Sequence, residues 1–287
     1  MDFSDVSSLL RQSRSVFAKG PVALIFLEDD VACEATVVHH LNAGFQTVVA
    51  FVSPDVPLGD ELSSRITTVE WNAATDEEPH EIVNLCIAAA PPIWFYYCFN
   101  AEFLYFPFCE TRSVGEVIAF TTEERRESIL TYVIDLYADD LGRYPNAVSL
   151  EDAYLDRSGY YALARKDDWD NPLERQMDFY GGLRWRMEEH IPKKRRKIDR
   201  VALFKSKKGL TLSEDHTFND AEYNTYACPW HHNVTAAICS FRTAKALKRN
   251  PGSTFDIETF RWHNSVRFEW HSQQLMQLGL MEPGQWF

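Results

Sequence analysis

The sequence lacks the glycine-rich turns that mark the common nucleotide-binding folds. A dinucleotide-binding protein shows GxGxxG after its first strand and a nucleoside triphosphatase shows GxxxxGK[ST], because backbone amides must approach the phosphates there. Here the first strand-like run, residues 21–27, ends in Glu28, Asp29 and Asp30. This absence disfavours both NAD-dependent enzymes and P-loop enzymes.

Basic residues are also scarce. The chain has 29 Lys and Arg against 42 Asp and Glu, which gives a net charge of -13 at pH 7. Such a balance opposes binding to nucleic acid and leaves at most peripheral contact with a membrane. One basic run, Lys193–Lys197, stands out, and it either attracts a diphosphate or an anionic membrane surface or is a solvated loop.

Long apolar runs and paired cysteines are absent. The longest apolar candidate, residues 87–108, is interrupted by prolines and polar residues and falls short of a membrane span of about 20 residues. The first 17 residues do not combine a basic leader with an apolar segment, so we expect a cytoplasmic protein, peripheral to the inner membrane at most. The six cysteines form no CxxC pair and are expected to be reduced.

The pattern that is present is that of an α/β protein. Residues 21–27 and 46–52 are short apolar runs typical of buried strands, and residues 31–43 between them have helical spacing. Further strands are predicted over residues 66–70 and 93–99, with a helix over residues 80–89 between them. Strand, helix and strand in this order predict a mostly parallel central sheet.

The C-terminal part is less regular. Helices are predicted over residues 123–137 and 234–247 and a strand over residues 201–204, whereas residues 138–180 receive no assignment. We therefore expect one domain, residues 1–287, with a helical elaboration at its C-terminal end.

Three segments resemble bacterial family 2-like glycosyltransferases. The first is Glu28-Asp29, followed ten residues later by His39-His40-Leu41-Asn42-Ala43-Gly44-Phe45 and by a strand ending near Asp55. The second, Trp94 to Leu104, is similar to the segment in which Trp leads through a strand to DxDEFL. The third and weaker one is Phe179 to Arg186, with the later Lys205 and His216.

This resemblance implies the GT-A type of fold, with a nucleotide-binding half over about residues 20–110 and an acceptor side over about 111–287. It implies transfer of a sugar from a nucleotide-sugar donor to a glycan or lipid-linked acceptor. In the family the DxD carboxylates hold a divalent cation against the diphosphate, because hard cations prefer oxygen ligands. Phe99 and Ala101 occupy these positions here, so we expect donor binding that is largely independent of metal.

The resemblance also implies a set of site residues. Glu28, Asp29 and Asp55 are expected to contact the nucleoside, and Arg184, Arg186 and Lys205 the diphosphate. Glu102 and His216 are the candidate catalytic groups. Structural roles compete with these: a solvated turn for the acids, an ion pair for Glu102, and core packing or capping for His39 and His40.

Two other functions fit the same residues. One is a catalytically inactive relative that binds a sugar nucleotide, a glycan or a partner protein as a scaffold. The other is a hydrolase that uses Glu102 and His216 as acid and base.

Overall fold

The computed structural model describes residues 1–229 and 231–286, and the chain forms two compact units. Unit 1 contains Met1–Phe103, Thr111–Ile129 and Val201–Asn224, and unit 2 contains Leu104–Glu110, Leu130–Arg200 and Thr225–Phe287. Strands β6, β7 and β12 change unit within their length. None of the helices in the described part of the chain combines the length and the apolar character needed to span a bilayer.

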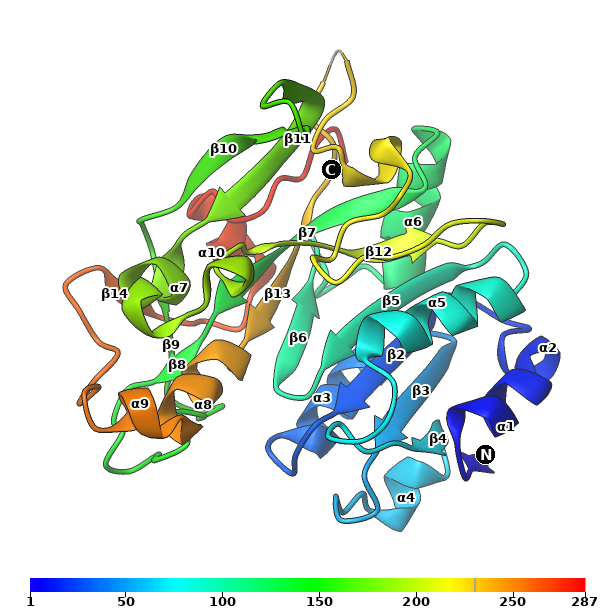
Figure 1. Ribbon diagram of the computed structural model, residues 1–287, viewed down its shortest axis with the longest axis horizontal. Helices are drawn as coiled ribbons and strands as arrows, with labels where there is room; N and C mark the ends of the chain where they lie inside the picture. Colours follow the sequence, from blue (N-terminus) through cyan, green and yellow to red (C-terminus); the bar gives the residue numbers. More distant parts are fainter. Residues whose placement is uncertain (230, 287) are drawn as a thin grey trace. The chain divides into compact units, whose positions relative to one another are not determined.

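A mostly parallel sheet forms the centre of unit 1, with strand order β1-β4-β3-β2-β5-β12 (Figure 1). Neighbouring strands are parallel except β5 and β12, which are antiparallel. The four predicted strands each begin one residue later than expected and end where expected. The bounds are β1 (Asp2–Phe3), β2 (Val22–Leu27), β3 (Thr47–Val52), β4 (Thr67–Glu70), β5 (Trp94–Phe99) and β12 (Asp199–Lys205). The α/β class and the mostly parallel sheet are thus confirmed.

Helices α3 and α5 connect the parallel strands. α3 leads from β2 to β3 and α5 leads from β4 back to β5, in the opposite direction along the sheet. Because such crossovers are right-handed, the two helices lie on opposite faces of the sheet, as Figure 1 shows. The helices of unit 1 are α1 (Val6–Arg11), α2 (Ser13–Val16), α3 (Cys33–Asn42), α4 (Asp60–Ser63), α5 (Pro79–Ala89), α6 (Val114–Glu123) and the 3-10 helix η3 (Ala221–Asn224).

The helix predicted over residues 123–137 is wrong. α6 ends at Glu123, and strand β7 (Ser128–Asp135) follows. A capping box between Ser113 and Glu116 starts α6 well before the predicted position. All positions of β7 but one are buried. A strand buried on both faces has apolar residues at every spacing, including the helical one, and this explains the error.

Unit 2 holds three groups of strands, together with part of β6 (Glu102–Tyr105). β7 pairs with β13 in parallel, β9 lies between β8 and β14 in an antiparallel sheet, and β10 and β11 form a hairpin. Their bounds are β8 (Tyr137–Ala138), β9 (Ala153–Asp156), β10 (Tyr161–Lys166), β11 (Pro172–Tyr180), β13 (Ala236–Ser240) and β14 (Ser265–Arg267). Three of them, β9, β10 and β11, lie within residues 138–180, the stretch for which the sequence predicts no element.

The helices of unit 2 are short: α7 (Gly182–Arg186), α8 (Arg242–Arg249), α9 (Pro251–Thr254), α10 (Ser272–Gln277), and the 3-10 helices η1 (Glu188–His190) and η2 (Lys193–Arg195). The helix predicted over residues 234–247 is wrong in its first half, where β13 lies, and correct in its second, where α8 lies. The C-terminal elaboration therefore mixes strands with helices. Its apolar cluster includes Leu183 of α7, Leu247 of α8 and Phe260.

Candidate functional site

The carboxyl ends of β2 and β5 mark the place in unit 1 where a ligand is expected. The chain goes from β2 to β3 on one side, and β5 lies on the other side of β2, so the strand order reverses here. Open α/β sheets bind ligands at the carboxyl ends of strands at such a switch point. Phe26 of β2 is level with Phe99 of β5. The residues that follow, Glu28-Asp29 and Asn100, therefore lie at one edge of the sheet.

Asn100 ties these two strand ends together. Its Oδ1 accepts a hydrogen bond from the backbone N–H of Glu28 at 3.0 Å. Its Nδ2 donates to Asp29 Oδ1 at 2.6 Å and to the carbonyl of Val31 at 2.9 Å. Asn100 is fully buried, whereas Glu28 and Asp29 are half-buried. The buried amide of Asn100 thus fixes the conformation of the acidic turn that follows β2.

The two positions that correspond to the metal-binding aspartates do not fit a divalent cation. Phe99 is buried and packs against Phe26, with 5.9 Å between ring centroids. Ala101 is fully buried in a left-handed backbone conformation, and its N–H donates to Thr36 Oγ1 at 2.9 Å. Neither side chain offers an oxygen ligand. Over residues 1–229 and 231–286, no group of three or more His, Cys, Asp or Glu could hold a metal ion.

Glu102 begins β6 and is fully buried. Its Oε2 accepts a hydrogen bond from the N–H of Phe99 at 3.0 Å, which closes the turn between β5 and β6. On α3, His40 is also fully buried, and its Nδ1 donates to the carbonyl of Thr36 at 2.8 Å. Burial lowers the pKa of His40 to about 3, although Glu102 acts in the opposite direction. His40 is therefore a neutral core residue, as predicted, and Glu102 has a structural role in the turn.

His216 lies on one face of β5, whereas His40, the residue that Glu102 influences electrostatically, lies on the other. The Nδ1 of His216 lies 2.9 Å from the hydroxyl of Tyr97, and the two rings stack. His40, on which Glu102 acts, contacts the neighbouring Cys98. Successive side chains of a strand point to opposite faces. This geometry gives no support to a hydrolase in which Glu102 and His216 form an acid–base pair.

Asp55 and Lys205 lie at different ends of the sheet. Asp55 is exposed in the turn after β3, the neighbour of β2, so it shares the carboxyl edge with Glu28. Lys205 is paired with Trp94, the first residue of β5, and its Nζ lies 3.6 Å from a carboxylate oxygen of Glu127. The length of β5 puts about 17 Å between these two edges. A diphosphate bound beside Glu28 is therefore out of reach of Lys205.

Arg184 and Arg186 lie on α7 in unit 2, and buried carboxylates hold both guanidinium groups. The Nε of Arg184 lies 3.1 and 3.2 Å from the two oxygens of Asp135, and a terminal nitrogen donates to the carbonyl of Lys197 at 2.7 Å. Arg186 donates twice to Asp156, at 2.7 and 3.1 Å. Breaking a buried pair of this kind costs about 3 to 5 kcal/mol. These internal bonds compete with the predicted contact of Arg184 and Arg186 with a diphosphate.

The basic run divides into an exposed and an internal part. Residues 193–195 form η2 and are exposed. Arg196 donates to the carboxylate and the carbonyl of Glu188 at 3.1 and 2.6 Å. Lys197 lies 3.3 Å from a carboxylate oxygen of Asp178. Only the first three cations of the run therefore present an exposed basic surface.

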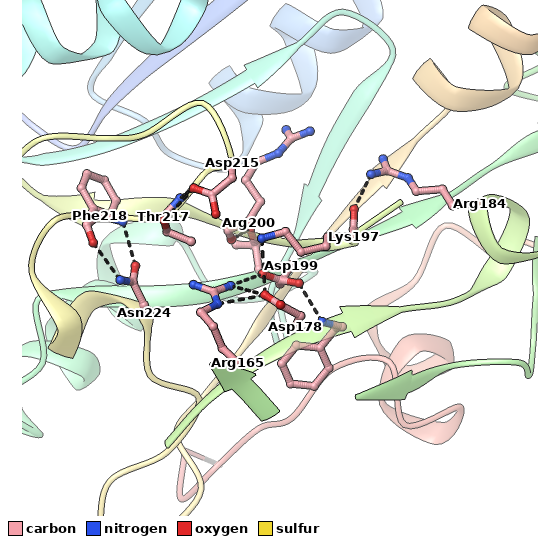
Figure 2. A network of polar contacts seen from close by, with 12 residues as sticks. Arg165, Asp178, Arg184, Lys197, Asp199, Arg200, Asp215, Thr217, Phe218 and Asn224 are labelled. Atoms are coloured by element: carbon pink, nitrogen blue, oxygen red, sulfur yellow. Dashed lines mark hydrogen bonds and ion pairs between the residues drawn. The ribbon is translucent and has the colours of Figure 1, made fainter. Parts of the chain in front are cut away.

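A second ionic cluster anchors the β10–β11 hairpin. Figure 2 shows the guanidinium of Arg165, on β10, beside the carboxylates of Asp178 on β11 and Asp199 on β12, at 2.8 and 2.9 Å. Burial raises the pKa of Asp199, and a hydrogen bond from the N–H of Phe179 opposes that rise. The hairpin is thus fixed to unit 2 by charge-assisted bonds.

Unit 2 also contains an open hollow of about 640 Å³ beside α7. Its lining includes Glu189, Asp256, Glu258 and His190, with Ile257 from the apolar cluster beneath. Hollows of this size receive small ligands, and carboxylates accept hydrogen bonds from hydroxyl groups. None of the residues predicted for the site lines it.

Sequence reasoning missed Asn100, which holds the acidic turn together. Asn100 lies between Phe99 and Ala101, the two positions that correspond to the metal-binding aspartates. The available signal was a polar amide directly after a buried strand, at the switch point of a parallel sheet.

No protein-family model matches the chain, and a search of curated proteins gave no match.

Proposed function

We propose that this protein is a glycosyltransferase of the GT-A type, which moves a sugar from a nucleotide-sugar donor to a glycan or lipid-linked acceptor. The observation that carries the proposal is the acidic turn at the switch point between β2 and β5, fixed by Asn100. An acid at this place in an α/β sheet is suited to accept hydrogen bonds from ribose hydroxyl groups. The three segments that resemble family 2 enzymes support the same proposal.

In this proposal Glu28 and Asp29 bind the nucleoside, and Asn100 positions them. Asp55 shares their edge and is free to reach the same ligand from the neighbouring turn. Because Phe99 and Ala101 do not fit a cation, donor binding is metal-independent. Charge on the departing diphosphate must then be met by hydrogen-bond donors of the chain.

A second candidate is a protein that binds a sugar nucleotide or glycan without transferring it. The burial of Phe99 and Ala101 favours it, since the usual means of stabilising the leaving group is missing. The engagement of Arg184 and Arg186 by internal carboxylates favours it as well. The two candidates share the donor site and differ in turnover.

Titration calorimetry with a panel of uridine, guanosine, cytidine and thymidine sugar nucleotides tests the proposal. We expect at least one of them to bind with the same affinity with and without Mn²⁺. Release of nucleoside diphosphate in the presence of acceptor glycans then separates the transferase from the binding protein. If no member of the panel binds, the transferase and a protein that binds a sugar nucleotide are both ruled out.

A further inference from the structure

Strand β10 has an open outer edge. It pairs with β11 alone, and over the described residues Tyr161–Lys166 make no backbone hydrogen bond to any other segment. Residues 161–164 are exposed, on both faces of the hairpin. An edge with unpaired N–H and C=O groups is a template for a further strand.

Large exposed apolar side chains lie along this edge and at both of its ends. Tyr161 and Leu163 of β10 are 45% and 56% exposed, and Trp169 at the tip of the hairpin is 81% exposed. Trp185 is 43% exposed and packs on Gly159, just before β10, where an added Cβ would lie 3.2 Å from its ring. Exposed apolar groups therefore follow β10 from its first residue to the tip of the hairpin, and such groups along an unpaired edge favour an interaction surface.

The edge is held in place before any partner arrives. Arg165 bonds to Asp178 and Asp199, and Tyr161 stacks on Tyr180 of β11 with ring centroids 5.3 Å apart. A preorganised edge loses little conformational freedom when a strand is added to it.

We propose that β10 pairs with β10 of a second copy of this chain, antiparallel and about a twofold axis. Two hairpins then form one four-stranded sheet, in the order β11-β10-β10-β11. A twofold axis keeps each residue on its own face of the sheet, so with Leu163 opposite Leu163 of the second copy, Tyr161 faces Arg165 and Ala162 faces Ala164. In this register no like charges lie opposite one another, and two exposed leucine side chains meet at the axis.

The same register brings the tryptophans together. The loop after Lys166 extends past the Tyr161 end of the other strand, where Gly159 and Trp185 of the second copy lie. Trp169 of each copy thus approaches Trp185 of the other, twice in the dimer. Burial of two such rings at each end adds apolar area that a short strand pair lacks, since an aromatic side chain buries about 150 to 250 Å².

The acidic loop favours a second copy over an anionic membrane, and the net charge of the chain sets the salt dependence. Asp167, Asp168 and Asp170 surround Trp169, and an anionic bilayer repels such a tip. Each copy carries a charge of -13, so two copies repel one another over long range. Salt screens this repulsion, and dimerisation should therefore strengthen as salt is added.

Sedimentation equilibrium over a range of protein and salt concentrations tests the proposal. We expect a monomer–dimer equilibrium whose Kd falls with salt. Leu163→Lys places two like charges near the axis and should raise the Kd at least about tenfold. Trp169→Ser should raise it as well. The matched control is Leu85→Lys, at a leucine of α5 with 39% exposure, which should leave the Kd unchanged.

Circular dichroism checks that each variant folds. A wild-type protein that stays monomeric at high concentration and high salt would overturn the proposal. So would a dimer that ignores both Leu163→Lys and Trp169→Ser. Binding of the wild type, but not of these variants, to vesicles of phosphatidylcholine with phosphatidylserine would assign the hairpin to a membrane instead.

Discussion

Replacing Asn100 by alanine removes the amide that joins the ends of β2 and β5. Two of its side-chain hydrogen bonds, to the N–H of Glu28 and the carbonyl of Val31, involve neutral groups, and the third, at 2.6 Å, goes to the carboxylate of Asp29. At about 1 kcal/mol for each neutral bond and about 2 kcal/mol for the charged one, the loss is about 4 kcal/mol. This is a large share of the stability of a typical domain, about 5 to 15 kcal/mol.

Urea unfolding followed by tryptophan fluorescence measures this loss. The midpoint should fall while the slope with urea stays the same, because the unfolded chain is hardly altered. Asn42→Ala, at the exposed end of α3, is the matched control and should stay within about 0.5 kcal/mol of the wild type. A loss below about 1 kcal/mol for Asn100→Ala would refute the view that this amide organises the edge.

The remaining predictions concern charge. Burial lowers the pKa of His40 from 6.5 to about 3, so between these values only the unfolded chain binds the proton and stability falls as the pH drops. The difference in unfolding free energy between His40→Phe and wild type should therefore change by about 2 kcal/mol from pH 7 to pH 5, and a constant difference would contradict this. Asn100→Asp places a carboxylate against Asp29, so it should unfold more easily in metal-free buffer and regain stability with Mn²⁺; indifference to Mn²⁺ would show that this edge accepts no cation. If the basic run binds anionic surfaces, replacing Lys193–Lys197 by serine should weaken binding to anionic vesicles by about 1 kcal/mol for each of the three exposed cations, and unchanged binding at low salt would leave a solvated loop.

The nucleotide-binding half of the fold could be predicted from the sequence because its signals are local. β2 and β3 are short apolar runs, and α3 between them ends near Gly44, whose positive φ of 94° favours glycine. Such patterns determine strand, helix and crossover without knowledge of distant contacts. β7 shows the limit, because its continuous burial depends on elements that cover both of its faces.

The candidate site was predictable only in part, since it depends on pairing across the sheet. The position of Glu28 and Asp29 follows from the end of β2. The position of Lys205 depends on the antiparallel direction of β12, for which the sequence gives no signal. The partners of Arg184 and Arg186 lie far away in the chain, so their internal ion pairs could not be foreseen.

Titration of the tightest-binding sugar nucleotide into site variants tests the central claim, that the edge of β2 and β5 is the donor site. Asp29→Asn keeps the shape of the side chain and removes its charge, so it should raise the Kd at least about tenfold, with or without Mn²⁺. Asp60→Asn, at an exposed carboxylate of α4, should leave the Kd unchanged. A Kd that is the same for wild type and Asp29→Asn, or binding that requires Mn²⁺, would contradict the account.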